Sequence, residues 1–168
     1  MTIFETDRIL VRRYEQADAE QFYQFNSDPV VMRYIRDPLT RQKSLEFLAE
    51  NIEFYSRFPE YGRWAMMDKS ANRYLGTFML RPSTALQEVE LGYALLTPFW
   101  GMGYATESVK GGLKYAFSEL GLESVIAITM PANLASQKVL YKTGFQLEKE
   151  YQEEGRILHL FRADKGIR

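Results

Sequence analysis

The stretch from 88 to 107 constrains the fold of this 168-residue chain more than any other part. Apolar and polar side chains alternate from 88 to 96, which is the periodicity of a strand. Gly101 and Gly103 then allow a tight turn, and apolar residues at helical spacing begin at Tyr104. Because the first amides of a helix lack intrahelical partners and carry the positive end of its dipole, the stretch predicts an anion site suited to phosphate.

Two familiar phosphate motifs are absent from this stretch. No G-x-x-x-x-G-K-[ST] sequence occurs, so the turn is not a Walker A loop. Gly101 and Gly103 are followed by Thr106 where the dinucleotide fingerprint requires a third glycine. Taken alone, the turn is equally compatible with a tight loop that binds no ligand.

Residues further along the chain favour the ligand-binding interpretation. A short β-branched strand at 124–129 precedes a helical segment with Asn133, Ser136, Tyr141, Gly144 and Phe145. Together with 90–93 and 99–107, this segment resembles the GNAT superfamily of acyl-CoA N-acyltransferases. The resemblance is strongest to the branch of ribosomal-protein N-terminal acetyltransferase-like enzymes. Residues 6–12 and 27–29 also resemble that branch, so the resemblance covers nearly the whole chain.

The chain-wide pattern predicts a single domain over 1–168 with an α/β (α+β) fold. We expect a mixed, mostly antiparallel sheet of six to seven strands, flanked by about four helices in the order β-α-α-β-β-β-α-β-α-β-β. The expected strands lie near 8–13, 64–67, 74–80, 88–96, 124–129, 145–151 and 157–162. The expected helices lie near 19–26 and 40–58, from 104 to 120, and from 133 onward.

The resemblance implies acetyl-CoA as the co-substrate, bound largely by backbone groups. Its pyrophosphate would lie on the turn formed by Trp100, Gly101, Met102, Gly103, Tyr104, Ala105 and Thr106. The family pattern [Q/R]-x-x-G-x-[G/A] has Trp100 at its first position here, so a side-chain contribution from that position is in doubt. The pantetheine arm of acetyl-CoA would pair with the backbone of Ala94, Leu95 and Leu96. Gly92, nearby in the same strand, is interpreted either as a bulge that opens the sheet or as a position of close packing.

The start of the last helix is expected to contribute to the same site. Asn133 is explained physically as a helix N-cap, and the resemblance adds a contact with the pantetheine arm, as it does for Ser136.

Two residues are candidates for acid–base chemistry. The resemblance assigns Tyr141 as the general acid for the leaving thiolate, although a tyrosine near a helix end is most often a packing residue. Glu90 lies in mid-strand, where glutamate is depleted, so it is a candidate general base. The competing interpretation of Glu90 is a charge paired across strands on a solvated face.

Composition excludes several other classes of site. Twenty-one basic against 22 acidic residues give a net charge of −1, which argues against a nucleic-acid surface. The absence of cysteine excludes a thiolate zinc site and a cysteine nucleophile, and no metal is expected. The sequence shows neither a signal peptide nor an apolar run of about 18 residues, so we expect no membrane association and a cytoplasmic location.

The expected activity is therefore acetyl-CoA-dependent N-acetyl transfer to a primary amine. Direct transfer in a ternary complex is expected, because no cysteine can carry the acetyl group. The branch resemblance points to a protein N-terminal α-amine. A small amine, such as a polyamine, an amino acid or an aminoglycoside, and a non-catalytic acyl-CoA-binding module are the alternatives. A homodimer is compatible with the resemblance.

Overall fold

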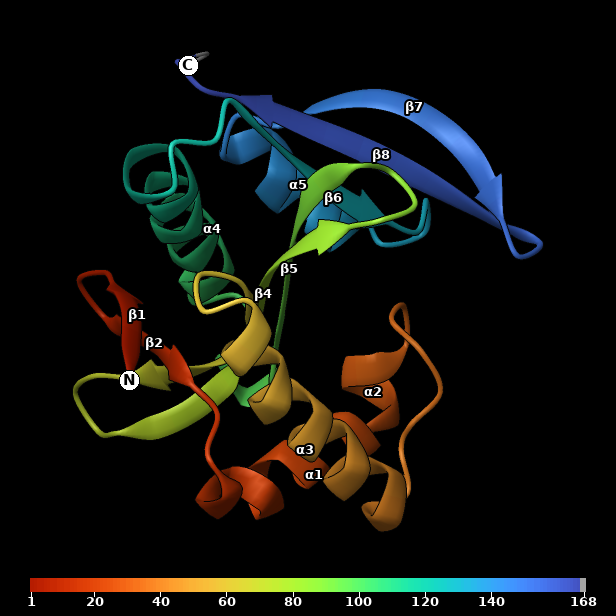
Figure 1. Cartoon of the computed structure of the whole chain (residues 1–168). Coiled ribbons are helices and arrows are strands. Elements are labelled where there is room, and N and C mark those ends of the chain that lie inside the picture. The colour runs from red at the N-terminus through yellow and green to blue at the C-terminus, as the bar shows by residue number, and fades with distance from the viewer. Residues whose placement is uncertain (167–168) are drawn as a thin grey trace.

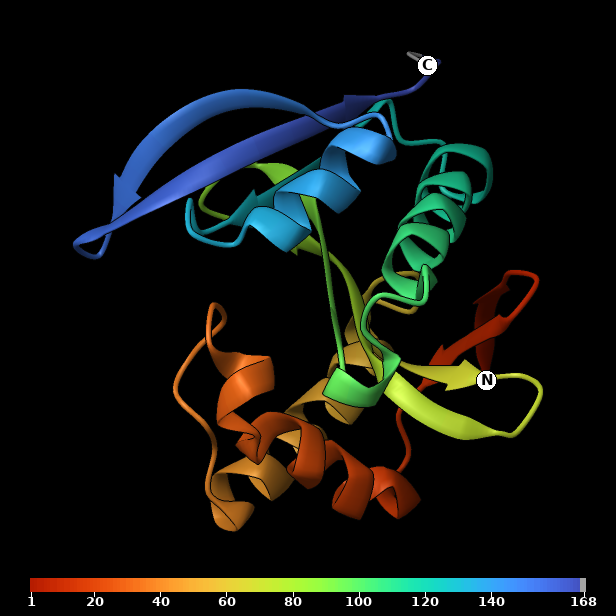
Figure 2. The ribbon, with the colours of Figure 1, turned by 180° about the vertical axis from the view of Figure 1, so that it is seen from behind.

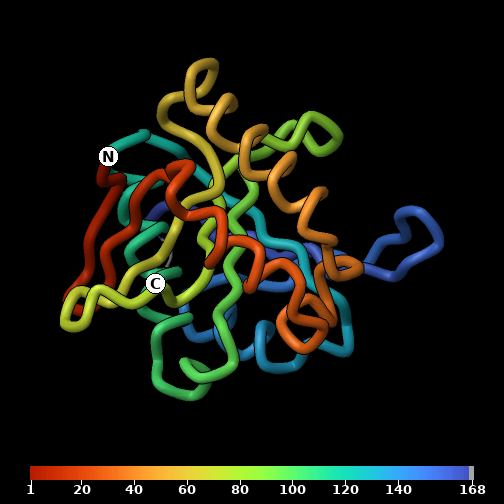
Figure 3. The backbone as a smooth tube through the Cα atoms, turned by 90° about the horizontal axis from the view of Figure 1, so that it is seen from below, coloured from red at the N-terminus to blue at the C-terminus, as the bar shows by residue number. Residues whose placement is uncertain are grey.

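The computed structural model describes residues 1–166 and builds them on one eight-stranded sheet (Figure 1). The strands are β1 (Thr2–Glu5), β2 (Ile9–Arg13), β3 (Gly62–Asp68), β4 (Arg73–Ser83), β5 (Glu88–Leu95), β6 (Ser124–Thr129), β7 (Gln146–Glu153) and β8 (Arg156–Asp164). Their spatial order is β1-β2-β3-β4-β5-β6-β8-β7, and only the β5–β6 pair is parallel. The β7–β8 hairpin projects from the rest of the fold (Figure 3).

Helices cover both faces of this sheet. They are α1 (Ala19–Ser27), α2 (Pro29–Met32), α3 (Arg41–Arg57), α4 (Tyr104–Lys114) and α5 (Leu134–Lys142), with short helical turns η1 (Gln16–Asp18), η2 (Thr97–Phe99) and η3 (Tyr115–Glu119). Helices α1–α3 lie toward the viewer in Figure 1, whereas α4 and α5 come to the front in the reverse view of Figure 2. Among residues 1–166, no helix combines the length and the apolar character needed to cross a bilayer.

The predicted fold class is confirmed, with eight strands instead of six to seven and five α-helices instead of about four. The additional strand, β1, pairs with β2 at the edge of the sheet. The additional helix, α2, begins at Pro29, shortly after the end of the helix that we expected near 19–26. Asp28 caps it by accepting from the amides of Val30 (2.8 Å) and Val31 (3.3 Å), and proline at the first helical position needs no amide partner.

The interpretation of Gly92 as a bulge is wrong. The β4–β5 register runs without a shift, and a Cβ at Gly92 would lie 3.2 Å from the Met79 terminal methyl, so close packing explains this glycine. The register shift occurs instead between β3 and β4, opposite Gly76, where a Cβ would lie 2.1 Å from the Ala94 carbonyl oxygen. Gly76 therefore lets β4 approach β5 closely.

Helix α4 packs unusually close to the sheet because it carries a glycine at the contact. A Cβ at Gly112 would lie 2.1 Å from Cζ of Phe78. The Phe78 ring cannot move aside easily, since it is fully buried, stacks on Trp64 at 6.3 Å and meets Phe4 edge-on at 5.3 Å. This contact fixes α4, and with it the turn that precedes α4, against the sheet.

We predict that Gly112→Ala destabilises the fold by about 1–3 kcal/mol, although alanine is the better helix former, because the added methyl overpacks the Phe78 contact. Urea unfolding of the variant measures this change. Lys110→Ala, at an exposed position of the same helix, is the control and should change stability by less than about 0.5 kcal/mol. A Gly112→Ala protein as stable as the unmodified chain would contradict the packing.

Candidate active site

Strands β5 and β6 meet at one point and then separate. Their parallel pairing is recorded only between Glu90 and Ile126, whereas β5 pairs with β4 along its whole length and β6 pairs with β8 likewise. Beyond Glu90, the edge of β5 that faces β6 therefore has no neighbouring strand. A cavity of about 340 Å³ lies at this opening.

The walls of the cavity come from both sides of the sheet. One side is formed by α5, which contributes Asn133, Ser136 and Leu140. The opposite side, which we call the connector side, is formed by residues 34–36 after α2 together with Arg63 of β3. The separated ends of β5 and β6 form the walls between these two sides.

The free edge of β5 presents the backbone of alternate residues. The Leu96 amide donates to the Leu75 carbonyl at 2.9 Å, so Leu96 and, two residues back, Ala94 direct their backbone groups toward β4. Tyr93 and Leu95 face the opening instead. The carbonyl of Leu95 already accepts from the indole Nε1 of Trp100 at 2.8 Å. Of the three residues expected to pair with pantetheine, Ala94 and Leu96 thus direct their backbone groups to β4, whereas Leu95, like Tyr93, faces the opening.

The glycine turn lies where β5 leads into α4. Gly101 and Gly103 have φ of 72° and 82°, a left-handed conformation that side chains with a Cβ rarely adopt. The first recorded helical bond of α4 is donated by Glu107 to the Gly103 carbonyl at 3.0 Å. Among the described residues, the backbone amides from Gly101 to Thr106 have no recorded acceptor, which is the arrangement that binds anions.

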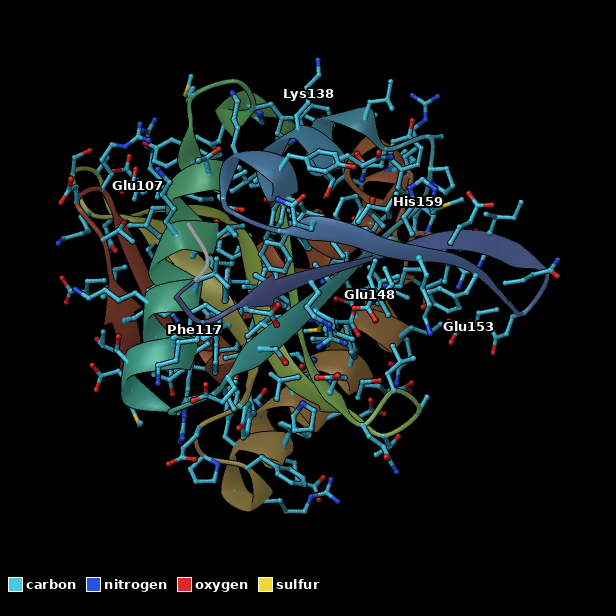
Figure 4. All side chains as sticks on the ribbon, turned by 90° about the horizontal axis from the view of Figure 1, so that it is seen from above. Glu107, Phe117, Lys138, Glu148, Glu153 and His159 are labelled. Carbon is cyan, nitrogen blue, oxygen red and sulfur yellow. The ribbon has the colours of Figure 1, made fainter. Side chains whose placement is uncertain are left out.

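A contact between distant parts of the chain holds this turn. The guanidinium of Arg8 donates to Glu107 at 2.6 Å and to the Met102 carbonyl at 3.0 Å, and it lies 4.3 Å from the Tyr104 ring centroid. The hydroxyl of Thr6 also donates to Glu107, at 2.6 Å. Figure 4 shows Glu107 on α4 beside the N-terminal strands. Glu107 therefore links the β1–β2 hairpin to α4, in addition to interacting favourably with the dipole of α4.

Glu90 lies on the cavity wall and makes no recorded hydrogen bond or salt bridge with the described residues. Burial raises the pKa of Glu90 above its ordinary value, and the negative charge of Glu153 acts in the same direction. Arg63 and Arg81 oppose this rise. Arg81 is the cross-strand partner of Glu90, but its guanidinium stacks on Phe54 at 4.0 Å. The interpretation of Glu90 as one half of a cross-strand ion pair is therefore wrong.

Tyr93 brings a hydroxyl group to the α5 side of the cavity. Its hydroxyl lies 3.0 Å from the Ser136 hydroxyl and donates to the Ser136 carbonyl at 3.2 Å. Burial raises the pKa of Tyr93 to about 12, and the hydrogen bond to Ser136 opposes the rise. The phenol is therefore protonated at neutral pH, and its single proton can be donated either to Ser136, as in this structure, or to another acceptor in its place.

Tyr141 lies outside the group of residues that line the cavity. Its side chain is 48% exposed and its ring packs edge-on against Phe161 at 5.3 Å. The neighbouring Leu140 is 1% exposed and lines the cavity, as do Ser136 and Asn133 at helical spacing. Leu140, and not the expected Tyr141, therefore lies on the cavity side of α5 in this structure.

Asn133 is an N-cap, as predicted, because its side chain accepts from the Ser136 amide at 3.2 Å. The cavity therefore receives Asn133 and Ser136 together. Among residues 1–166, no cluster of three or more His, Asp or Glu side chains is placed to hold a metal ion.

The sequence patterns missed Arg8, Tyr93 and Arg63. Arg8 meets Glu107 across 99 positions of sequence, and no local pattern signals such a contact. Tyr93 fits the alternation of a core strand, so periodicity gives no sign that its hydroxyl reaches the cavity. Arg63 could have been found from the sequence, because it is a charged residue between the buried neighbours of β3.

Comparison with known proteins identifies similar chains. A family model described as "Acetyltransferase (GNAT) domain" matches residues 8–146. "Uncharacterized N-acetyltransferase YoaA" of Bacillus subtilis is 29% identical over 150 residues, which cover 87% of this chain and 84% of the relative. "Probable N-acetyltransferase YjcK" of the same species is 33% identical over 148 residues, which cover 83% and 81%.

Solved structures share the fold at lower identity. A GNAT-family acetyltransferase from Bacillus anthracis has a TM-score of 0.85 at 23% identity, with 98% of each chain covered. The ribosomal L7/L12 α-N-protein acetyltransferase RimL, in complex with coenzyme A, has a TM-score of 0.80 at 14% identity, again with 98% of each covered. Spermidine N-acetyltransferase from Vibrio cholerae, with CoA and spermine, scores 0.79 at 17% identity, covering 96% of this chain and 98% of that one.

We predict that Glu107 makes the fold sensitive to acid. Desolvation raises the pKa of Glu107, but the hydrogen bonds from Thr6 and Arg8 leave it below its ordinary value of 4.5. A carboxyl whose pKa is lower in the folded state contributes stability above the unfolded-state pKa, and this contribution is lost as the pH falls through the folded-state pKa. The stability of Glu107→Gln, measured by urea unfolding, should therefore be lower at neutral pH and should depend less on pH below 4.5.

Glu119→Gln, at an exposed position after α4, is the control for this comparison. It should follow the pH dependence of the unmodified protein. Equal slopes for Glu107→Gln and the unmodified protein would show that the ion pair with Arg8 does not couple to folding.

Proposed function

The chain belongs to the GNAT acetyltransferase family and is an acetyl-CoA-dependent N-acetyltransferase, and we propose that transfer takes place in the cavity between β5 and β6. The observation that best supports this site is the edge of β5 left unpaired within the described residues, with a half-buried carboxylate, Glu90, on the same wall. We propose further that the whole chain, 1–168, works as one domain.

We propose that acetyl-CoA lies along the free edge of β5. The backbone of Tyr93 and the amide of Leu95 would pair with the pantetheine arm, beside Asn133 and Ser136 of α5. The amides of the turn from Trp100 to Thr106 would hold the pyrophosphate. Among the described residues, the amides from Gly101 to Thr106 have no recorded acceptor, which supports the placement, whereas the Trp100 amide already donates to the Thr97 carbonyl at 3.2 Å. Arg8 contributes by holding the turn in position through Met102.

The proposed reaction is direct attack of a neutral amine on the thioester carbonyl carbon. The carbon–nitrogen bond forms and the carbon–sulfur bond breaks, while the nitrogen loses one proton and the sulfur gains one. We assign Glu90 as the proton acceptor. The pKa of Glu90 is raised toward neutral pH, where a general base is more effective. No residue among 1–166 forms an ion pair with its carboxylate, so the carboxylate is available.

We assign the donor at the leaving sulfur to Tyr93 in place of Tyr141. Tyr93 lines the cavity and its hydroxyl is held beside Ser136, whereas Tyr141 does not line it. A hydrogen bond from the phenol would stabilise the negative charge that develops on sulfur. The presence of both Glu90 and Tyr93 in one cavity favours an enzyme over a non-catalytic acyl-CoA-binding module.

The acceptor that the branch resemblance favours is a protein N-terminal α-amine, and the alternative is a small amine. RimL is described as an α-N-protein acetyltransferase, whereas the Vibrio cholerae neighbour is described as a spermidine N-acetyltransferase. Both share the fold with this chain to the same degree, so the choice depends on the chemistry of the cavity.

We predict that Glu90→Gln lowers kcat by roughly 10²–10⁴-fold, because it removes the general base. Affinity for acetyl-CoA should stay unchanged. In the unmodified protein, kcat/KM should fall as Glu90 is protonated, and the raised pKa places this acidic limb above the ordinary 4.5. Rates across a pH series, with amine acetylation followed by thiol release, measure both effects.

Glu88→Gln is the matched control for that series. Glu88 lies two residues earlier on β5 and pairs with Arg162 at 2.9 Å, away from the cavity. It should retain the activity and the acidic limb. Full turnover in Glu90→Gln would remove Glu90 from the mechanism.

We predict that removing the hydroxyl group lowers turnover at Tyr93 and leaves it nearly unchanged at Tyr141. Tyr93→Phe should lower kcat by roughly tenfold or more, because a hydrogen bond to a charged group contributes about 1.5–3 kcal/mol. Tyr141→Phe should stay within about twofold of the unmodified protein, since an exposed side chain outside the cavity is removed. Turnover of both folded variants at saturating acetyl-CoA decides between them. A loss of turnover in Tyr141→Phe alone would restore the assignment made from the sequence.

A further inference from the structure

Within the part of the chain that the structure describes, two guanidinium groups on the connector side of the cavity have no carboxylate partner. Arg36 follows α2 and Arg63 lies on β3, and both line the cavity. Each packs on the ring of Phe47, with Cζ atoms 4.7 and 4.9 Å from the ring centroid. Among residues 1–166, neither arginine takes part in a salt bridge. Phe47 thus holds two like charges together beside the cavity.

The hydrogen-bonding capacity of both groups is only partly used. Arg63 donates to the Asn51 side-chain oxygen at 3.3 Å and to the sulfur of Met79 at 3.2 Å, which is a weak acceptor. Arg36 donates to the side-chain oxygen of Asn26, and its Nε is buried without a partner in the described part of the chain. A buried donor without an acceptor costs free energy of folding. A ligand that brings an acceptor group to this side of the cavity would therefore be stabilised there.

The electrostatics of the cavity also favour an anion at this position. Burial, followed by repulsion from Arg36 and Arg81, lowers the pKa of Arg63 to about 10, which leaves it positively charged at neutral pH. A negative group bound between the guanidiniums would relieve this repulsion. The other charged residues of the cavity are Glu90, Glu153 and Arg156. Glu153 and Arg156 belong to the β7–β8 hairpin and carry opposite charges at exposed positions, and Figure 4 shows Glu153 near the tip of this hairpin.

The sheet register places these cations at a defined distance from Glu90. Arg63 pairs with Met79 on β4, and Met79 pairs with Gly92 on β5, two residues from Glu90 on the same face. Neighbouring strands lie about 4.8 Å apart, so the backbones of β3 and β5 are about 10 Å apart. The long side chain of Arg63 reaches across part of this distance, which leaves room for a few bonds between an amine at Glu90 and an anion at Arg63.

From this arrangement we infer that the acceptor is a primary amine with a carboxylate a few bonds from its nitrogen, the amine facing Glu90 and the carboxylate bound by Arg63 and Arg36. The inference rests on the proposed function of the cavity. Two sources have this chemistry: a free amino acid, and a protein N-terminus followed by an acidic residue. A polyamine does not fit, because its second cation would meet the arginines.

The test compares acceptor pairs with and without the anion, at equal concentrations of the unprotonated amine. Alanine is set against alaninamide, and an Ala-Glu peptide against an Ala-Gln peptide, both with blocked carboxyl ends, with spermidine as the polyamine. Each is assayed for kcat and KM at saturating acetyl-CoA. At least one carboxylate-bearing acceptor should exceed its neutral partner in kcat/KM by roughly tenfold or more. The pair that shows the difference identifies the source.

Variants assign that preference to the arginines. Arg63→Gln and, independently, Arg36→Gln should lower the ratio of kcat/KM for the preferred acceptor to kcat/KM for its neutral partner by roughly tenfold or more. Arg63→Lys should restore part of the preference, because it keeps the charge and loses the planar fork. Arg33→Gln, at an exposed position of the same connector and outside the cavity, is the control.

Equal use of the neutral partners or of spermidine would overturn the inference and leave the proposed function intact. A preference that survives in both Arg63→Gln and Arg36→Gln would also overturn it. If no amine at all is acetylated by the folded protein, the proposed function fails as well. Thermal unfolding of each variant establishes that the comparison is made on folded protein.

Discussion

The separation of β5 from β6 after one shared pairing is the constraint on which the rest of the structure depends. Each strand stays in place because its other edge is fully paired, β5 with β4 and β6 with β8. The inner edge of β5 therefore keeps backbone donors and acceptors that no strand satisfies. Such groups need a partner, and a ligand with an extended, amide-containing arm can supply one along the sheet.

Elements on either side of the opening give it two chemically different ends. On the α5 side, the N-terminus of a helix, Asn133 and the Tyr93–Ser136 contact provide neutral hydrogen-bonding groups. On the connector side, Arg36 and Arg63 provide positive charge. Glu90 stands between the two ends at the point where the strands part. An acetyl group delivered from one end and an amine from the other would meet beside this carboxylate.

The sequence predicts those parts of the site that depend on local backbone physics. Alternation, glycines and capping predict β5, the turn at Gly101 and Gly103, and the N-cap Asn133, because each depends on neighbouring residues. The direction in which an individual side chain points is predicted less well from the sequence. Adjacent helical residues point about 100° apart, so a motif position such as Tyr141 does not by itself tell which side chain of α5 lines the cavity, and here Leu140 does. The Arg8–Glu107 contact depends on tertiary structure and has no local signal.

Thermal unfolding with and without acetyl-CoA tests the central claim most directly, with ATP and NAD as controls. If acetyl-CoA binds at the opening of β5, a concentration about 100 times its Kd adds about 2.7 kcal/mol to the stability of the folded state. We predict a clear rise in Tm with acetyl-CoA and none with ATP or NAD. An unchanged Tm at saturating acetyl-CoA, or an equal rise with ATP, would contradict the assignment of this opening to the cofactor.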